Sequence, residues 1–494
     1  MTGHNGGPGE VAAEHAGAGS DATRDEAGNK DAAGDAARRT ARDTGRDMAR
    51  VQAELSTRWP EDKLDPSLDR IRALVDILGS PQAAYPVIHV AGTNGKTSTA
   101  RMIETLLRGF GLRTGRFTSP HLSSVTERIS IDGEAVSPRR FVELYQDVAP
   151  YLDIVDADQP IRLSYFEVLT AMGFVAFADA PVDVAVVEVG MGGSWDTTNV
   201  ADGRVAVVTP IGLDHTDRLG NTLAAIAGEK AGIIKPGAFA VFANQEPEVA
   251  EVLTSRAGQM GATVARQGVE FGVTERRIAV GGQLLHLQGL GGAYPEVFLP
   301  LHGAHQAQNA ACALAAVEAF FGADQTTGTI STDVVKTAFA QVSSPGRLEP
   351  VRSAPTVLVD AAHNPAGMTV TVAAVREEFA FGHLVGVVAM LRDKDVRGML
   401  HLLEPILDEV VVTRNSSPRC MPADNLAVLA VDTFGADRVT VETRFDDAVE
   451  TAVRLAEEAS ARGEVELGGA GVLVTGSVVT AGEARLLLKG GGDG

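Results

Sequence analysis

A short run of small and polar residues in the first fifth of the chain has the composition of a phosphate-binding loop. The β-branched stretch Val87–Ala91 ends at Gly92, the chain turns through Thr93, Asn94 and Gly95, and Lys96-Thr97-Ser98 opens a helical pattern. Backbone N–H groups and the positive end of a helix dipole favour phosphate at such a turn. Lys96 supplies a cation, and Thr97 or Ser98 supplies a hydroxyl for Mg²⁺. The full pattern wants a glycine where Val90 stands, so an ordinary glycine-rich turn is the alternative.

Polar residues also lie within or just after three other predicted strands. Glu188 lies inside the apolar run 182–190, where an uncompensated carboxylate is costly, so it binds either a cation or a salt-bridge partner. His215 follows the strand predicted at 204–209. Ser119 comes directly after another short predicted strand. Ligands bind at the carboxyl edge of open parallel sheets. The competing interpretations are a solvated loop histidine and a serine that merely begins a turn.

Lys230 shares a face with Leu223, Ile226 and Ile234 if residues 222–236 form a helix. A lysine on an apolar face extends to solvent, pairs with an acid such as Glu167 or Glu188, or is chemically modified. A second long helix opens with three polar side chains that either cap it or contact a nucleotide: His305, Gln306 and Asn309.

The stretch Ser343–Glu349 breaks the helical pattern and marks a domain boundary. Beyond it, strands predicted at 356–360, 384–390, 408–413, 437–441 and 471–475 alternate with helices, which predicts a doubly wound parallel sheet. Asp360–Pro365 and Asp393–Asp395 follow the first two of these strands. They are expected at the ligand edge of that sheet.

Bulk properties narrow the class of protein. A chain of 494 residues needs more than one core, and its net charge of −21 argues against nucleic acid and anionic membranes as partners. The two cysteines, Cys312 and Cys420, suggest no disulfide framework, and no leader or membrane-spanning run is evident, so a cytoplasmic protein is expected. Residues 1–48 are poor in large apolar side chains and predict a disordered tail, with amphipathic helices from residue 49.

Taken together, these stretches resemble folylpolyglutamate synthase/dihydrofolate synthase of the Mur ligase superfamily. The resemblance runs in one order from about residue 49 to the C-terminus, and the residues that carry it are Gly92–Ser98, Thr118–Leu122, Phe166-Glu167, Glu188–Gly193 with Asp196 and Asn199, Asp214-His215, Glu229–Ile234, His305-Gln306 with Asn309, Pro345–Arg347, Asp360–Pro365, Asp393–Asp395 and Thr475–Ser477. It implies an α/β fold with a central parallel-sheet ATPase domain containing the phosphate loop (49–342) and a smaller Rossmann-like C-terminal domain (347–494).

The resemblance also implies roles for individual residues. The expected ATP-binding set is Thr93, Asn94, Gly95, Lys96, Thr97, Ser98, Asn309, Arg347, Asp360 and His363. Mg²⁺ would be held by Ser119, Glu188 and His215, and Lys230 would be carbamylated into an anionic ligand. The residues implied in catalysis are Lys96, Lys230, His215 and Arg347. The substrate side would be formed by Phe166 and Asp196 near the pterin, with His363, Asp393 and Lys394.

The implied activity is ATP-dependent joining of L-glutamate to dihydropteroate, to folates or to both, through an acyl phosphate and in a monomeric enzyme. A ligase for UDP-N-acetylmuramoyl precursors is the alternative within the superfamily. It carries a folded sugar-binding domain before the phosphate loop, for which about forty patterned residues are too few. A nucleotide-binding regulator without ligase activity is the alternative from another class, and the acids and histidines at the sheet edges argue against it.

Overall fold

A computed structural model describes residues 1–3, 42–60, 66–462 and 469–490, which divide into two compact units, Met1–Leu55 and Ser56–Gly494. Most of the predicted tail, residues 4–41, lies outside the described residues. Residues 42–56 are helical, so the helix begins before the amphipathic pattern that starts at residue 49. In the described part of the chain no helix is both long and apolar enough to cross a membrane.

The phosphate-loop stretch belongs to an eight-stranded sheet with the order β4-β3-β2-β5-β1-β6-β7-β8. Its six parallel strands are β2 (Thr114–Phe117), β5 (Val184–Glu188), β1 (Val87–Ala91), β6 (Gly203–Val208), β7 (Phe239–Phe242) and β8 (Thr263–Arg266). A hairpin, β3 (Ile129–Ile131) with β4 (Glu134–Ala135), adds an antiparallel edge. The central strands are buried along their whole length, as their unbroken β-branched sequences require.

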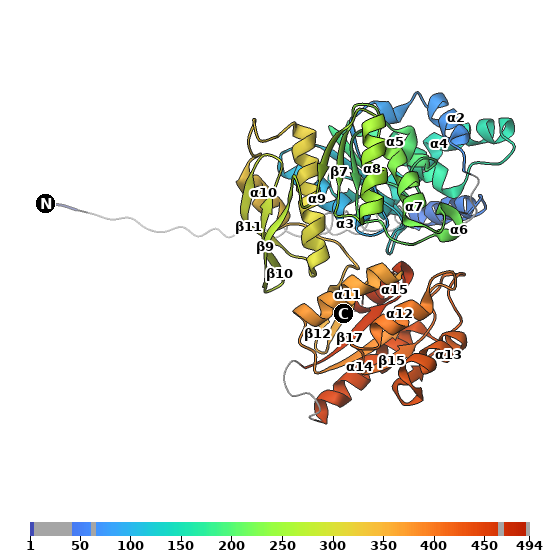
Figure 1. The fold of residues 1–494 in the computed structure, drawn as a ribbon, viewed down its shortest axis with the longest axis vertical. Coiled ribbons are helices and arrows are strands. Elements are labelled where there is room, and N and C mark those ends of the chain that lie inside the picture. The colour runs from blue at the N-terminus through green and yellow to red at the C-terminus, as the bar shows by residue number, and fades with distance from the viewer. Residues whose placement is uncertain (4–41, 61–65, 463–468, 491–494) are drawn as a thin grey trace. The chain divides into compact units, whose positions relative to one another are not determined.

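Helices cover both faces of this sheet (Figure 1). On one face, Ile88, Val90 and Val186 pack with apolar residues of α3 (Lys96–Gly109), α9 (Ala304–Phe321) and α10 (Thr332–Phe339). On the other face, residues of β6 and β7 pack with α7 (Leu223–Lys230) and α8 (Pro247–Gln259). The remaining helices described before α7 are α2 (Asp69–Ile77), α4 (Pro138–Asp158), α5 (Tyr165–Asp179) and α6 (Thr216–Leu219).

The helix predicted across residues 222–236 is shorter than expected. α7 ends at Lys230, and Ala231–Ile233 forms a 3-10 turn, so Ile234 does not share a helical face with Lys230. A side chain at Gly232 would clash with Ser194, whose Oγ lies 2.2 Å from the place of its Cβ. The close approach of that neighbouring loop explains why the chain turns here.

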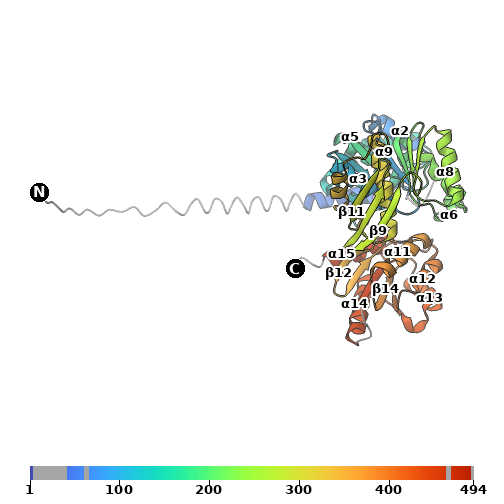
Figure 2. The same ribbon diagram turned by 60° about the vertical axis from the view of Figure 1, so that its left-hand side comes forward.

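A three-stranded antiparallel sheet in the order β11-β10-β9 lies beside α9 (Figure 2). Its strands are β9 (Gly272–Ala279), β10 (Gly282–Gln288) and β11 (Ala293–Leu299). The sequence indicates short strands in this stretch but not their assembly into a separate sheet.

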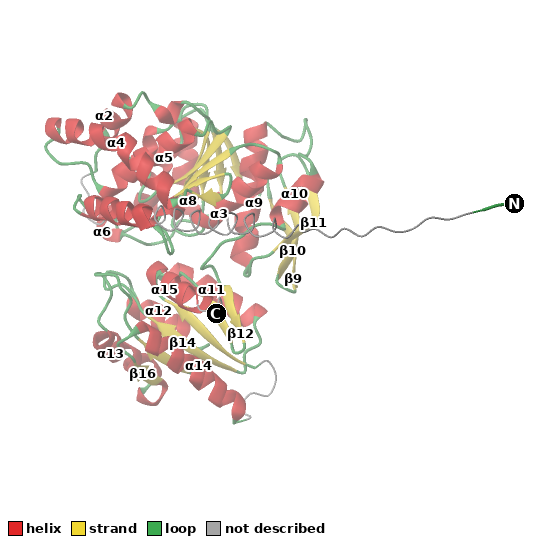
Figure 3. Cartoon of the chain, turned by 180° about the vertical axis from the view of Figure 1, so that it is seen from behind, coloured by secondary structure: helices red, strands yellow, loops and turns green. Residues whose placement is uncertain are grey.

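The C-terminal strands form a six-stranded sheet with the order β12-β13-β17-β14-β15-β16, confirming the predicted doubly wound fold (Figure 3). They are β12 (Glu349–Ser353), β13 (Thr356–Val359), β14 (His383–Val388), β15 (Glu409–Val412), β16 (Val439–Val441) and β17 (Ala470–Thr475), parallel except for β12. α11 (Pro365–Glu378), α12 (Val396–Leu403) and α13 (Ala423–Phe434) cover one face. α14 (Phe445–Ala461) and α15 (Val478–Gly490) cover the other.

Candidate functional site

The loop between β1 and α3 has the backbone geometry that a phosphate-binding loop requires. Gly92 and Gly95 adopt φ values of 146° and 86°, and Gly95 is the N-cap of α3. A Cβ on Gly92 would lie 1.9 Å from Thr209 Oγ1, so this position has no space for a side chain. Lys96 Nζ donates to the carbonyls of Gly92, at 3.1 Å, and Thr93, at 3.0 Å. Its ammonium group is thus held over the loop, where phosphate oxygens would bind.

The two hydroxyls that follow Lys96 point to different partners. Thr97 Oγ1 donates to Glu188 Oε1 at 2.9 Å. Ser98 Oγ lies 3.0 Å from Ser344 Oγ and accepts from Gln306. Thr97 is therefore the hydroxyl on the acidic side of the site, a choice that the sequence leaves open.

Glu188 ends β5 as a buried carboxylate, and Ser119 N donates to its Oε2 at 3.4 Å. Burial raises the pKa of Glu188, and the charges of Lys96 and Arg347 oppose that rise. No salt bridge to Glu188 is found among the described residues, so the predicted pairing of this acid with a basic side chain is not present. A buried carboxylate with this environment is suited to a cation.

His215 lines the same cavity as Glu188 and Ser119, a space of about 170 Å³. Burial lowers the pKa of His215 to about 4, so its imidazole is neutral and able to bind a metal. No group of three His, Cys, Asp or Glu side chains in the described ranges is placed to hold a metal by itself. A carboxylate, two hydroxyls and one imidazole still fit Mg²⁺, which binds few protein ligands and completes its shell with water and phosphate.

Lys230 is buried at the end of α7 in the same cavity. Burial and the charge of Lys96 lower its pKa to about 7. The acids expected as its partners are engaged elsewhere: Glu167 forms a salt bridge with Arg70 at 3.1 Å, and Glu188 accepts from Thr97. The simple salt bridge predicted for Lys230 with either acid is therefore absent.

Asn309 and Gln306, at the start of α9, bind each other and the phosphate loop rather than capping their helix. Asn309 Nδ2 donates to Gln306 Oε1 at 3.1 Å, and a Cβ on Gly95 would lie 2.6 Å from Asn309 Oδ1. The N-cap of α9 is Gly303, without a side-chain hydrogen bond. The capping interpretation is thus wrong for these residues. His305 also lines the cavity.

The C-terminal domain supplies the opposite wall, with Arg347, Asp360 and His363 lining the cavity. Asp360 accepts from Leu348 N and Ala362 N, both at 2.9 Å, and from Thr371 Oγ1 at 2.8 Å. It therefore anchors the backbone next to Arg347. His363 Nδ1 donates to the Ala361 carbonyl at 3.0 Å, and burial, followed by the charge of Lys394, lowers its pKa to about 4.

Polar contacts at Asp214, in the loop after β6, join this wall to the first sheet. Asp214 accepts from Lys394 Nζ at 2.5 Å and from Asn364 Nδ2 at 3.0 Å. Asn364 also exchanges amide hydrogen bonds of 3.1 and 3.3 Å with Asn94 of the phosphate loop. Although burial raises the pKa of Asp214, the charges of His215, Lys394 and His363 hold it below its usual value. Asp214 is thus an anion that links the two domains.

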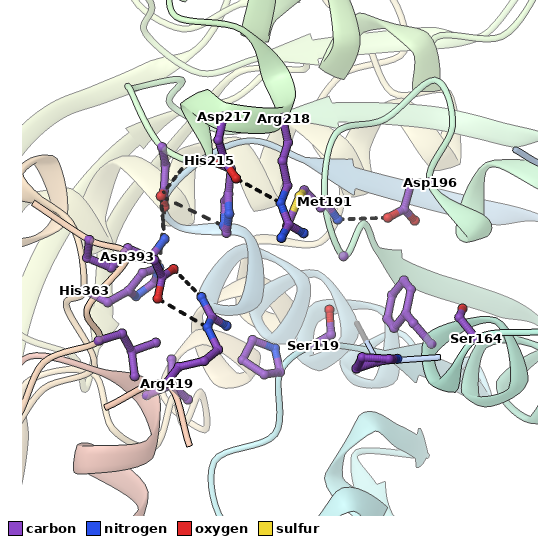
Figure 4. A pocket seen from close by; sticks show the side chains of 18 of the residues that line it. Ser119, Ser164, Met191, Asp196, His215, Asp217, Arg218, His363, Asp393 and Arg419 are labelled. Atoms are coloured by element: carbon purple, nitrogen blue, oxygen red, sulfur yellow. Dashed lines mark hydrogen bonds and ion pairs between the residues drawn. The ribbon is translucent and has the colours of Figure 1, made fainter. Parts of the chain in front are cut away.

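A second and much larger cavity, of about 1360 Å³, adjoins the first. All five residues expected on the substrate side line it: Phe166, Asp196, His363, Asp393 and Lys394. Figure 4 labels Asp196, His363 and Asp393 among the residues of this cavity. Ser119, Met191, His215 and His363 belong to the walls of both cavities. Asp393 forms a salt bridge with Arg419.

Sequence reasoning missed several residues of the larger cavity. Arg419 lies in a loop without any recognisable motif, and Arg218 follows His215 in a stretch interpreted only for its histidine. Asn364 lies in the stretch Asp360–Pro365 that was expected at the ligand edge, and its amide oxygen accepts from Gly367 N at 2.8 Å as the N-cap of α11. Its contacts with Asn94 and Asp214 leave no signal in the sequence.

Comparisons with known proteins agree with this geometry. The Mur ligase middle domain matches residues 90–317, and the Mur ligase glutamate ligase domain matches residues 346–478. The dihydrofolate synthase/folylpolyglutamate synthase of Mycobacterium tuberculosis is 53% identical over 454 residues, which are 89% of this chain and 93% of that protein. A solved structure of the Mycobacterium tuberculosis folylpolyglutamate synthase complexed with ADP has a TM-score of 0.86 at 53% identity and covers 90% of this chain and 99% of its own. A folylpolyglutamate synthase complex with AMPPCP and folate has a TM-score of 0.75 at 28% identity and covers 89% and 98%.

Proposed function

The chain belongs to the Mur ligase family and is an ATP-dependent ligase of the dihydrofolate synthase/folylpolyglutamate synthase type, and we propose how its residues divide the work. Such a ligase joins L-glutamate to the carboxyl group of dihydropteroate or of a folate. One observation carries the assignment of roles: the cavity of the phosphate loop and the larger cavity share Ser119, Met191, His215 and His363. A carboxylate held in the larger cavity can therefore reach a phosphate held over Lys96.

The reaction needs no nucleophilic side chain. An oxygen of the acceptor carboxylate attacks the γ-phosphorus of ATP, the bond to ADP breaks, and an acyl phosphate forms. The glutamate amine then attacks the acyl carbon, and the bond to phosphate breaks as an amide forms and a proton leaves. Lys96 and Arg347 both line the smaller cavity and would neutralise the oxygens that gather there. The enclosing second domain excludes the water that would hydrolyse the acyl phosphate.

Thr97, Ser119, Glu188 and His215 would hold Mg²⁺, with the carboxylate of Glu188 as the anionic ligand. The ion would supply positive charge to the transferring phosphoryl group. Thr97 rather than Ser98 belongs to this set, because only Thr97 reaches Glu188.

We also propose that Lys230 is carbamylated. A pKa of about 7 leaves a large neutral fraction of its amine near pH 7, and a neutral amine can attack CO₂. The N–C bond that forms turns a buried cation into an anion and releases a proton. The charge of Lys96, which disfavours the ammonium form of Lys230, favours the carbamate.

Phosphate release with ATP, Mg²⁺ and L-glutamate, with and without dihydropteroate, tests the activity. Release that depends on both dihydropteroate and glutamate supports the ligase. Release that depends on a UDP-N-acetylmuramoyl acceptor would point to the other branch of the family, and release indifferent to any acceptor would point to a nucleotide-binding regulator. Replacing dihydropteroate by tetrahydrofolate in the same assay separates the two folate activities. The expected cytoplasmic location and monomeric state stay predictions.

A further inference from the structure

His89 is a buried histidine in the middle of β1 that the reaction does not use. It lies on the face of the sheet opposite Ile88 and Val90 and has no exposed surface. Its Nε2 lies 2.9 Å from Thr198 Oγ1, and its Nδ1 has no hydrogen-bond partner in the described part of the chain. An unpartnered buried nitrogen is unfavourable, and an apolar residue of similar size would pack in β1 without it. Packing alone therefore does not explain why a histidine stands at this position.

The hydrogen bonds run from His89 through Thr198 to Asp196, and the carboxylate of Asp196 sets which group donates in each. Burial raises the pKa of Asp196, and hydrogen bonds from Thr198 and from the backbone of Met191 oppose that rise. Both carboxylate oxygens accept backbone N–H groups, and Thr198 Oγ1 donates to Oδ1. The threonine oxygen is then free to accept from His89, which places the imidazole proton on Nε2. Burial lowers the pKa of His89 to about 3, which keeps the ring in this neutral form.

Asp196 in turn closes the loop Gly190–Asp196. Its Oδ2 accepts from Met191 N at 2.9 Å (Figure 4). Its Oδ1 accepts from Thr198 N at 3.0 Å. Gly190, Met191 and Asp196 line the larger cavity, and a Cβ on Gly190 would lie 2.5 Å from the Phe166 ring. The loop therefore sets the wall against which the acceptor would lie.

The other side of the same loop lies against the end of α7. A Cβ on Gly193 would lie 2.6 Å from the carbonyl oxygen of Glu229 and 2.8 Å from Cα of Lys230. Ser194 N donates to the Glu229 carbonyl at 3.0 Å. The backbone at the end of α7 therefore supports this side of the loop, so the His89 chain fixes the opposite side, toward the acceptor.

We propose that His89 is a positioning residue that holds the loop Gly190–Asp196 in place for the acceptor, acting through Thr198 and Asp196. The inference rests on the proposed function, because it takes the larger cavity as the pteroate or folate site. His89 reaches the acceptor only through Thr198 and Asp196, whereas ATP lies over Lys96. Its loss therefore acts on the acceptor more than on the nucleotide.

The test compares His89→Met, which removes the donor at similar size, with His89→Gln, whose amide nitrogen can reach the place of Nε2. Thr198→Val removes the next member of the chain. Thr114→Val is the matched control, because Thr114 lies in the same sheet with a buried hydroxyl that has no partner. For each variant, KM values for dihydropteroate and ATP are measured by phosphate release, the dissociation constant for dihydropteroate by calorimetry, and the unfolding midpoint in urea.

We expect His89→Met and Thr198→Val each to raise the KM and dissociation constant for dihydropteroate by about tenfold, the equivalent of one hydrogen bond in a charged network. The KM for ATP stays unchanged, and the double variant is no worse than either single one because both break the same chain. His89→Gln regains most of the affinity, and Thr114→Val behaves like the wild type.

An unchanged dihydropteroate affinity in His89→Met would overturn the inference, as would an equal rise in the KM for ATP or a failure of His89→Gln to restore affinity. If His89→Met does not fold, Thr198→Val and His89→Gln carry the same comparison. Absence of dihydropteroate-dependent phosphate release in the wild type would instead refute the proposed function. The two failures are therefore distinguishable.

Discussion

Leu122 joins the loop that carries Ser119 to the core of the C-terminal domain. Its side chain packs against the apolar cluster that includes Val359, Ala481 and Ala484. A Cβ on Gly482, in α15, would lie 2.0 Å from the Leu122 carbonyl oxygen. Gly482 does not have a positive φ, so alanine fits its helical backbone and the only obstacle is this contact. Gly482→Ala is therefore a probe of how the two domains meet.

The magnitude follows from two opposing contributions. Replacing a helix glycine by alanine normally stabilises a helix by roughly 0.5–1 kcal/mol. At Gly482 the new methyl group would meet a backbone atom far inside van der Waals distance, and overpacking of this kind costs roughly 1–3 kcal/mol. The net effect is a loss of roughly 0.5–2 kcal/mol in the docked arrangement, or about two- to thirtyfold in its population.

The displaced segment bears directly on the site. Ser119 begins the loop that carries Leu122, and its backbone N–H donates to Glu188. We expect Gly482→Ala to lower kcat by the factor given above, measured as dihydropteroate-dependent phosphate release. The dissociation constant for ADP should change less, because most contacts of the phosphate loop lie within the first sheet.

Gly258→Ala is the control for this change. Gly258 lies in α8, and a Cβ there would have nothing within 4 Å. This variant should gain a little in unfolding midpoint and keep full activity. If Gly482→Ala keeps the kcat of Gly258→Ala and shows the same gain in stability, the contact with Leu122 does not hold the site and the reasoning is refuted.

Three further predictions concern the residues of the smaller cavity. Glu188→Gln keeps the shape of the side chain but removes its charge, so it should lower kcat by roughly 100-fold or more while the fold stays intact. Normal Mg²⁺-dependent turnover in this variant would exclude Glu188 as a metal ligand. Thr97→Val should raise the Mg²⁺ concentration needed for half-maximal rate far more than Ser98→Ala, because only Thr97 contacts Glu188, and a Mg²⁺ titration of both variants measures this. For Lys230, the folded-state pKa of about 7 lies below the ordinary value of 10.5, so the unfolded chain binds more protons between these values. In bicarbonate-free buffer, the free energy of unfolding of the wild type should therefore fall relative to that of Lys230→Met as the pH decreases from 10 to 7. Urea midpoints measure this difference, which should shrink at high pH. Parallel pH profiles of the two proteins would show that the pKa of Lys230 is not perturbed. Added bicarbonate should raise wild-type activity and leave Lys230→Met unchanged.

Much of this site could be predicted because it follows from strand ends. Glu188 closes an apolar run, and Lys96 follows a glycine turn after another. In a parallel sheet the carboxyl ends of strands meet at one edge, so the pattern alone brings these residues together. The alternation of strands and helices after residue 349 predicts the second sheet, which the structure confirms.

Other features depend on the direction of side chains and on how two domains meet, which no periodicity encodes. Thr97 and Ser98 are adjacent hydroxyls, and only the helix geometry turns the first toward Glu188 and the second toward Ser344. His89 looks like an exception in an apolar strand, and its partner Thr198 is 109 positions further along the chain. The link between Lys394 and Asp214 spans 180 positions.

The distribution of charge between the two sheets explains why the domains must meet for the chemistry to proceed. Two acids of the smaller cavity, Glu188 and Asp214, come from the first sheet and the loop after β6, whereas Arg347 and Lys394 come from the second domain. When they meet, Lys394 neutralises Asp214, and Arg347 adds a second cation to the cavity that Lys96 lines. If the domains separated, Asp214 would lose the ammonium group of Lys394, and the phosphates would keep Lys96 but lose Arg347. The contacts that seat the second domain are therefore also the contacts that complete the charge of the site.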